Sequence, residues 1–291
     1  MSPIVLFVYN RPWHTRQTVE ALLQNPLARQ STLYVFADGA RRLKEAPKVE
    51  EVRQFVRRLT GFRRVHLSES RTNLGLANSV IRGVSEVVER EGRAIVMEDD
   101  LVCSAEFLAF MNDALLAYQT NPLVFSVSGY TYPLSVPPAY SSDVCLLPRA
   151  SSWGWGTWAD RWQRADWQVS DYEAFSKDPV ARQLFVAGGE DLWPMLQKQQ
   201  KGRIDSWAIR WTYAHYRHRA YCLSPVRSKI RTTGADDSGT HLGNTKRYDV
   251  TVGEAAYALP ADPQPDPALI ENLRRFFKPS PVRRLINWLT L

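Results

Sequence analysis

Three consecutive acidic residues, Glu98-Asp99-Asp100, follow directly on the apolar run Ala94–Met97. Such a run is typical of a buried strand, which would deliver all three carboxylates to one edge of a sheet. Neighbouring carboxylates repel one another, so a bound cation readily explains the cluster. Hard Mg²⁺ or Mn²⁺ takes one or two carboxylates, completes its shell with phosphate oxygens and water, and offsets charge on a departing diphosphate. The alternative is a solvated acidic turn or a helix N-terminus.

The elements that would position these residues alternate between strand-like and helix-like stretches. Strands are expected at Ile4–Tyr9, Leu33–Ala37, Arg64–Leu67, Ala94–Met97 and Leu123–Val127, and helices at Trp13–Gln24, Lys48–Leu59, Gly75–Arg90 and Ser104–Tyr118. This alternation predicts a mostly parallel sheet with helices on both faces. Because ligands of such sheets bind beyond the carboxyl ends of the strands, the turns Asn10-Arg11, Asp38-Gly39 and Glu98-Asp99-Asp100 should share one rim.

The residue composition of the chain changes after Gly129. A Pro-, Ser- and Tyr-rich region with one expected strand at Val144–Leu147 leads into Ser151–Trp167, which holds five of the ten tryptophans. Aromatic faces stack on sugar rings and glycines allow close backbone approach, but the same residues could form an aromatic core. Leu192–Arg219 should be mostly helical, and Ala220–Arg231 should form one or two strands.

Composition bounds the classes of protein that fit. The 291 residues, 44% hydrophobic and 23% charged, suit a globular chain, and no apolar run is long enough to span a bilayer. The N-terminus lacks the features of a signal peptide, so we expect a cytoplasmic protein. The net charge of +7 favours an anionic partner, and a nucleotide diphosphate or an anionic membrane surface suits its distribution better than nucleic acid does.

The C-terminal segment is basic and amphipathic. Arg274, Arg275, Lys278, Arg283 and Arg284 alternate there with Phe276, Phe277, Leu285, Ile286, Trp288 and Leu289. The pattern fits a helix lying on the inner face of the cytoplasmic membrane, or a helix docked on the protein's own core. The expected organisation is therefore two halves of one domain, residues 1–128 and 129–257, followed by a linker and C-terminal helices in residues 258–291.

The acidic triplet resembles the DXD-type metal motif of GT-A glycosyltransferases, and its Glu-Asp-Asp form is similar to that of the N-acetylglucosaminyltransferase I family. The resemblance covers roughly residues 3–245 and includes a segment from Arg71 to Asn78 that is similar to one in family-2 glycosyltransferases. It implies a GT-A-type, Rossmann-like sheet with a mixed acceptor-side region, a UDP-sugar donor and Mn²⁺ or Mg²⁺ bound by Asp100. The nucleotide-binding residues that it implies are Asn10, Arg11, Asp38, Arg71, Asn73, Gly75, Asn78, Glu98 and Asp99.

The same resemblance assigns the acceptor side. Ser152–Trp158 looks like the Gly-x-Gly-Trp stretch of that family, which implies sugar or acceptor contacts for Trp153, Gly154, Trp155 and Trp207. An inverting transferase needs a carboxylate base, for which the candidates are Asp160, Asp166, Glu190, Asp191 and Asp205. Ile204–Arg210 resembles the family's Asp-Asp-Trp-Met-Arg motif, so Asp205 is the expected base and Glu190 with Asp191 the second choice. Asp205 could equally be a helix N-cap.

The polar loop Thr233–His241 completes the expected site. Many GT-A enzymes use a C-terminal His as a metal ligand, so His241 is the second metal candidate, although a lone loop His is more often solvated. The chain departs from the wider pattern at Arg231, where Asn is usual. A glycan, lipid-linked or lipopolysaccharide-type acceptor is expected.

Two other classes of protein are alternatives to a glycosyltransferase. A metal-dependent nucleotidyltransferase would carry a glycine-rich, basic signature after the first strand, which Asn10-Arg11-Pro12 does not match. A non-catalytic carbohydrate- or nucleic-acid-binding protein would leave the acidic triplet unexplained. A dinucleotide-dependent dehydrogenase is disfavoured because no G-x-G-x-x-G motif follows a strand.

Overall fold

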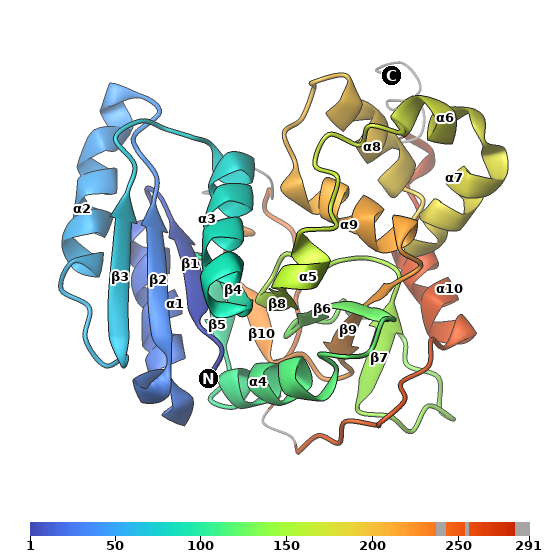
Figure 1. Ribbon diagram of the computed structural model, residues 1–291, viewed down its shortest axis with the longest axis horizontal. Coiled ribbons are helices and arrows are strands. Elements are labelled where there is room, and N and C mark those ends of the chain that lie inside the picture. The colour runs from blue at the N-terminus through green and yellow to red at the C-terminus, as the bar shows by residue number, and fades with distance from the viewer. Residues whose placement is uncertain (237–242, 254–255, 283–291) are drawn as a thin grey trace.

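The fold is built on an eight-stranded mixed sheet with strand order β3-β2-β1-β4-β8-β6-β9-β7 (Figure 1). The computed structural model describes residues 1–236, 243–253 and 256–282. The strands are β1 Ile4–Val8, β2 Thr32–Ala37, β3 Arg64–Glu69, β4 Arg93–Glu98, β6 Val124–Ser128, β7 Val144–Leu147, β8 Trp155–Trp158 and β9 Tyr221–Pro225, with β5 Leu101–Cys103 and β10 Ile230–Thr232 forming a second, two-stranded sheet. The α/β class expected from the sequence is confirmed.

The N-terminal half of the sheet is parallel. Its inner strands are continuous apolar runs, as is typical of strands buried on both faces. All five residues of β1 are buried, and this strand pairs in parallel with β2 on one side and β4 on the other. The second half is mixed. Strand β8 lies antiparallel between β4 and β6, β9 is parallel to β6, and β7 closes the edge antiparallel to β9. The sheet therefore continues across residue 128, so the two sequence halves share one core.

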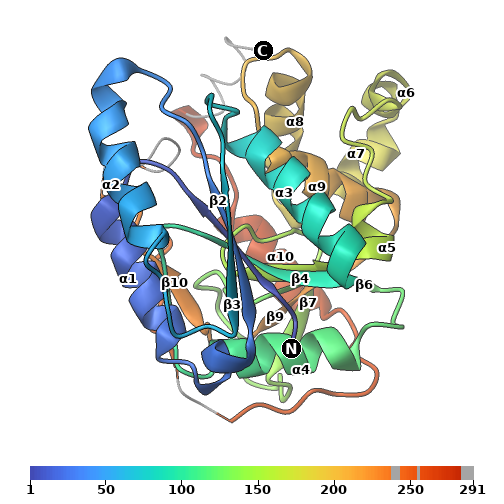
Figure 2. The same cartoon turned by 60° about the vertical axis from the view of Figure 1, so that its left-hand side comes forward.

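Helices cover both faces of the sheet. On one face lie α1 Pro12–Leu23, α2 Ala46–Val56 and α4 Phe107–Ala117, and on the other α3 Leu76–Glu91, α5 Ala159–Trp162 and α9 Trp207–Arg217. Figure 2 shows α1 and α2 on one side of the sheet and α3, α5 and α9 on the opposite side. The helices α6 Tyr172–Lys177, α7 Pro179–Phe185 and α8 Leu192–Gln200 pack with α9 in a further apolar cluster, and the remaining short turns are η1 Pro26–Gln30, η2 Leu43–Glu45 and η3 Val186–Gly188.

Strand β8 lies where the sequence pattern predicts no strand. Trp155–Trp158 was expected to be an aromatic segment, yet it forms β8 at the centre of the sheet. Two tryptophans and a glycine in four residues do not show the alternation of a half-buried strand, because both faces of this strand are buried. Its Trp155 joins the α3–α9 side of the core and its Trp158 joins the α4 side.

A buried histidine lies in this aromatic core. His215 on α9 is fully buried, with Nδ1 2.8 Å from the carbonyl oxygen of Trp211 and Nε2 2.8 Å from Oγ of Ser126. Since a carbonyl only accepts, Nδ1 carries the proton and Nε2 accepts from the serine hydroxyl. Burial lowers the pKa of His215 to about 4, an effect to which the nearby His218 adds. The imidazole is therefore a neutral part of the core at physiological pH.

The C-terminal helix docks on the protein's own core. In α10, Pro267–Phe276, the side chains of Leu269 and Leu273, together with the following Phe277, pack against Cys145 and Leu147 of β7. The structure thus shows the second of the two expected placements for this helix, with its apolar side packed inside the molecule, and contact with a membrane stays a prediction. Residues 283–291, including Arg283 and Arg284, lie outside the described residues. Within the described part of the chain, no helix is both long and apolar enough to cross a bilayer.

Candidate active site

The predicted site residues gather mainly at the edge of the sheet where the parallel strands end. Strands β1, β2 and β4 are neighbours and run in the same direction, so the residues that follow them are adjacent. Strand β8 runs the opposite way, and its first residue, Trp155, pairs with Val96 near the end of β4. This register places Trp153 and Gly154 at the same edge. The start of α9 lies close to the first residue of β8, because the Trp207 ring stacks on Trp155 with centroids 5.0 Å apart.

At this rim, Arg11 bridges two of the three acidic side chains. Its Nη2 lies 2.7 Å from Oδ1 of Asp99 and 2.8 Å from Oδ2 of Asp100. The backbone N–H of Tyr9 donates to the second oxygen of Asp99 at 3.2 Å. Both aspartates are buried, at 5% and 8% exposure. The positive charge that the acidic triplet requires is thus supplied here by a guanidinium from the turn after β1.

Crowding of the carboxylates perturbs their ionisation. Burial, followed by the charges of Asp100 and Asp99, raises the pKa of Glu98 to about 8, although Arg11 opposes the shift. Burial and the charge of Asp100 also raise the pKa of Asp99 against the effect of Arg11. One guanidinium therefore does not compensate three carboxyl groups. The raised pKa favours the neutral form of Glu98, which can donate a hydrogen bond to a ligand.

Two buried polar atoms at this place lack partners among the described residues, namely Oδ1 of Asp100 and Nη1 of Arg11. The described chain contains no group of three His, Cys, Asp or Glu side chains that could hold a metal. A hard divalent cation needs only one or two protein carboxylates when phosphate oxygens and water fill the rest of its shell. Asp100, with Asp99 beside it, fits that requirement, and its free oxygen is available for it.

Residues 232–236 run directly alongside Asp100. Strand β10 pairs with β5 so that Thr232 faces Leu101, and both N–H and Oγ1 of Thr233 donate to the Asp100 carbonyl, at 2.8 and 3.1 Å. A Cβ at Gly234 would lie 2.0 Å from Oδ2 of Asp100, so only glycine fits this close approach. The expected metal ligand His241 lies outside the described residues. Arg231 is an exposed residue of β10.

The last described residue before that gap is tied to the first helix. Oδ2 of Asp236 lies 3.1 Å from Nε2 of His14, which is buried on α1 three residues after Arg11. The contact brings the end of the 232–236 segment to the turn that carries Arg11. Sequence reasoning missed His14, because a single histidine in an amphipathic helix carries no signal of its own.

Asp38, one of the expected nucleotide-binding residues, holds the loop before α3. Its two carboxylate oxygens accept from the backbone N–H groups of Gly39 at 2.8 Å, Leu74 at 2.9 Å and Gly75 at 3.0 Å, and from Nδ2 of Asn73 at 3.0 Å. Arg71 and Asn78 are exposed on either side of this loop. Asp38 therefore links the end of β2 to the helix that faces the expected nucleotide.

Arg53, which the sequence analysis did not single out, also contacts the backbone near this loop. Nη2 of Arg53, on α2, lies 3.2 Å from the carbonyl oxygen of Asp38 and 2.5 Å from that of Ser70, in a largely buried position. The guanidinium joins the ends of β2 and β3. In the sequence Arg53 is one of several basic residues of an amphipathic helix, and nothing distinguishes it from its solvated neighbours.

The tryptophans divide between the core and the rim. Trp155 is fully buried and Trp207 is 3% exposed, so a sugar ring reaches neither face in this structure, and their role here is packing. Trp153 is partly exposed and lies edge-on to Tyr130 and Tyr248, with centroids 4.6 and 5.5 Å away. Gly154 has a φ of +60°, which allows the chain to turn into β8. Of the expected set, Trp153 is placed to meet a ligand, whereas Gly154 is buried next to Ile230 and Phe107.

Asp205 is an accessible carboxylate beside this aromatic core. Its Oδ1 lies 2.9 Å from Nη2 of Arg210, which is largely buried, while the Asp205 side chain is 57% exposed. The N-cap of α9 is Ser206, whose hydroxyl accepts from the N–H of Ile209 at 3.3 Å, so Asp205 is not the cap. Its carboxylate is thus held in place by Arg210 but remains open to solvent.

The second-choice bases are more strongly restrained. Both oxygens of Asp191 accept from the largely buried guanidinium of Arg149, each at 2.9 Å, and the Asp191 side chain is 27% exposed. Glu190 forms a longer ion pair with Arg274 at 3.8 Å. Of the two sites, the geometry at Asp205 suits proton transfer better.

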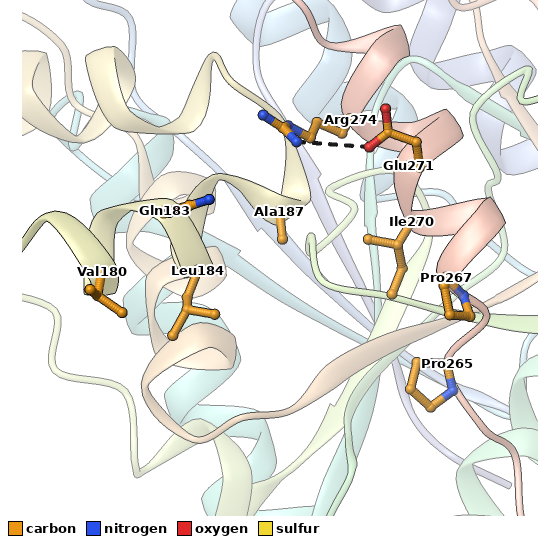
Figure 3. Close-up of a pocket in the computed structure, with 9 residues that line it drawn as sticks. All are labelled: Val180, Gln183, Leu184, Ala187, Pro265, Pro267, Ile270, Glu271 and Arg274. Carbon is orange, nitrogen blue, oxygen red and sulfur yellow. Dashed lines mark ion pairs between the residues drawn. The ribbon is translucent and has the colours of Figure 1, made fainter.

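A separate pocket of about 450 Å³ lies between α7 and α10 (Figure 3). Its lining includes Val180, Leu184 and Ile270, and the ion pair between Arg274 and Glu271 spans 3.8 Å at its side. None of the predicted site residues lines this pocket, so it is distinct from the rim that carries the acidic triplet.

The chain was compared with family models, curated proteins and solved structures. No family model matches the chain, and no curated protein matches it. A solved structure of residues 1–349 of S. aureus TarS, a GT-A-type glycosyltransferase, aligns with a TM-score of 0.43 and 11% identity over 81% of this chain and 62% of that one. A second S. aureus TarS structure aligns with a TM-score of 0.41 and 13% identity over 81% of this chain and 38% of that one. The chain thus spans less than two thirds of either, and a likeness this distant carries no conclusion about activity.

Proposed function

We propose that this chain is an inverting glycosyltransferase that moves a sugar from a nucleoside diphosphate donor, first of all a UDP-sugar, to a hydroxyl group of a glycan or glycolipid. The observation that carries the proposal is that Asp99 and Asp100 follow β4 at the edge of the sheet where β8 begins, and that Trp207, two residues after Asp205, stacks on Trp155 of β8. Such a transfer needs a site for the diphosphate and a separate carboxylate for the acceptor.

The donor side consists of groups that recognise an anion or a hydroxyl. Asp100, with Asp99, would hold Mn²⁺ or Mg²⁺, which when bound offsets charge on the leaving diphosphate. Arg11 carries a guanidinium suited to phosphate oxygens, and exposed Arg71 lies in the loop that leads to the N-terminus of α3. Glu98 lies directly before Asp99 and Asp100 in the chain and offers a carboxyl group to a ribose or sugar hydroxyl.

On the acceptor side, Asp205 is the base. Its carboxylate takes the proton of the acceptor hydroxyl as that oxygen attacks the anomeric carbon and the bond to the diphosphate breaks. Arg210 is a positioning residue, because its guanidinium holds the carboxylate at 2.9 Å. Trp153 supplies an aromatic surface for a sugar ring beside the triplet.

The first test is ligand-dependent thermal stability. Wild type and Asp100→Asn are melted with UDP, GDP, ADP or CDP, each with and without Mn²⁺. A ligand at about a hundred times its dissociation constant adds roughly 2.7 kcal/mol, which is readily seen. The proposal expects one diphosphate to stabilise wild type in the presence of Mn²⁺ and to lose that effect in the variant. A folded wild type that responds to none of them would refute it.

The base is tested by Asp205→Asn against Asp160→Asn. Asp160 has a similar setting, 69% exposed and 2.8 Å from a largely buried Arg161, but it follows β8 at the opposite end of that strand from the rim. We expect Asp205→Asn to retain donor binding and to lower the release of UDP from the donor sugar by about 10²- to 10⁴-fold, whereas Asp160→Asn is unchanged. Equal rates in the two variants would remove Asp205 from this role.

A further inference from the structure

One nitrogen atom of Arg11 contacts both carboxylates that are proposed to bind the cation. The three side chains are 16%, 7% and 11% exposed for Arg11, Asp99 and Asp100, so the cluster is largely shielded from water. Charges in such a place interact strongly, and an unpaired one is costly. A divalent cation that arrives alone must therefore share the two carboxylates with a guanidinium of the same sign, or displace it into a site without a counter-charge.

A nucleoside diphosphate changes this balance. Its oxygens carry negative charge that can accept the guanidinium in a charge-assisted pair while the carboxylates turn to the metal. Arg11 has a donor ready for such a partner, because its Nη1 is buried and makes no hydrogen bond with any described residue. Oδ1 of Asp100 is the matching unused acceptor on the carboxylate side. Nη1 of Arg11 could thus bind the negatively charged diphosphate, and Oδ1 of Asp100 could bind the positively charged metal.

From this arrangement we infer that Arg11 is an internal counter-ion that couples the binding of the divalent cation to the binding of the donor diphosphate. The inference rests on the proposed function and assigns Arg11 a role beyond contacting the nucleotide. In the empty protein Arg11 pairs with Asp99 and Asp100 and disfavours binding of the metal by itself. When the diphosphate is present, Arg11 moves to the phosphate oxygens and the metal takes its place on the carboxylates.

Linkage gives the inference a quantitative form. If the diphosphate raises the affinity for the metal by some factor, the metal raises the affinity for the diphosphate by the same factor. Direct contact between metal and phosphate contributes to this factor in any variant. The share that comes from Arg11 depends on its charge, so it disappears when the charge is removed and persists when the charge is kept.

The experiment compares Arg11→Gln, which keeps a side-chain N–H donor without charge, with Arg11→Lys, which keeps the charge. Mn²⁺ is titrated into each protein by calorimetry, with and without saturating UDP. We expect Mn²⁺ alone to bind Arg11→Gln at least about tenfold more tightly than wild type, and the enhancement by UDP to shrink by the same factor. Arg11→Lys should stay close to wild type in both respects.

Arg149→Gln is the control for position. It removes the charge of another largely buried arginine that is paired with an aspartate, Asp191, outside the triplet. Its Mn²⁺ titration should match that of wild type. If Arg11→Gln is unfolded without metal, Mn²⁺ alone should refold it, as followed by circular dichroism.

The outcomes separate this inference from the proposed function. Equal affinity of wild type and Arg11→Gln for Mn²⁺ alone, in proteins that still bind UDP with Mn²⁺, overturns the inference and leaves the function intact. Tight binding of Mn²⁺ to wild type without any nucleotide, or failure of Mn²⁺ to refold an unfolded Arg11→Gln, also overturns it. If no diphosphate binds wild type, while Arg11→Gln gains affinity for Mn²⁺, the proposed function fails and the counter-ion role on the carboxylates stands.

Discussion

Replacement of Asp38 by asparagine should detach the loop before α3. The two oxygens of Asp38 share their donors, with Gly39 N–H at 2.8 Å and Leu74 N–H at 2.9 Å on Oδ1, and Gly75 N–H and Asn73 Nδ2, both at 3.0 Å, on Oδ2. Asparagine offers one oxygen in place of two. In either orientation of its amide, an NH₂ group faces two N–H donors and cannot accept from them.

The cost follows from the number of bonds lost. Hydrogen bonds to a charged group contribute about 1.5–3 kcal/mol each, and the partial exposure of Asp38 lets water replace some of that, so Asp38→Asn should lower the free energy of unfolding by about 2–4 kcal/mol. Asp178 is the matched control. Its Oδ1 alone accepts from the N–H groups of Val180 at 2.9 Å and Ala181 at 3.0 Å at the start of α7. Asparagine caps helices as well as aspartate does, so Asp178→Asn should change stability by no more than about 0.5 kcal/mol.

Urea unfolding measures both variants, and hydrogen exchange locates the effect. Asp38→Asn should speed exchange of the Leu74 and Gly75 amides while that of the central strands follows only the global loss of stability. A cost for Asp38→Asn no larger than that for Asp178→Asn would show that the carboxylate does not hold this loop, and would return Asp38 to a role in ligand contact alone.

Three further predictions concern His215 in the core, Gly234 beside Asp100 and the helix α10. The pKa of His215 is about 4 when folded, below its ordinary 6.5, so the unfolded state binds more protons between these values, and stability should fall by up to about 3 kcal/mol from pH 7 towards pH 4. In urea titrations across this pH range, His215→Gln should lack that part of the loss, and a parallel decline in both proteins would contradict the assignment. Gly234→Ala, whose Cβ would lie 2.0 Å from an oxygen of Asp100, should lose Mn²⁺-dependent UDP binding, whereas Gly253→Ala, whose Cβ meets nothing closer than Arg227 Cβ at 3.8 Å, should keep it; equal binding would show that the segment yields easily. Leu273→Ala removes a fully buried side chain of α10 and should cost about 2–5 kcal/mol in urea unfolding, against little for Leu184→Ala, whose side chain is 62% exposed; a negligible cost at Leu273 would mean that the helix is not docked in solution.

Much of the first half of the fold was predictable, because its strands and helices carry regular apolar patterns. The strand at Val144–Leu147 was located at its observed bounds, and the strand before the acidic triplet within a residue at each end. Strand β8 was missed because a four-residue strand buried on both faces has neither alternation nor length to reveal it. Its position between β4 and β6 comes from tertiary pairing, and it is this pairing that brings Trp153 and Gly154 to the rim.

The chemical types in the site were predictable, whereas their pairing was not. The acidic triplet and Asp38 could be picked out because charged residues that directly follow buried strands must lie at an edge of the sheet. Whether a given tryptophan faces a ligand or the core depends on which helix covers it, and α9 comes fifty residues after Trp155 and buries it. The bonds from Asp38 to residues 73–75 likewise join segments that only the assembled sheet brings together.

Arg11 illustrates why this distinction matters for function. From the sequence, three adjacent carboxylates demand a cation, and a metal ion is the simplest candidate. In the folded chain this cation is Arg11, almost ninety positions away in the sequence. Strands β1 and β4 are paired neighbours, so the turn after β1 lies beside the triplet. A site that already contains one positive charge binds a free metal ion less readily, and it can exchange that charge when a diphosphate offers Arg11 another partner. The arrangement thus favours a protein that takes its cation together with its donor, and the Mn²⁺ affinity of Arg11→Gln measures how far that preference goes.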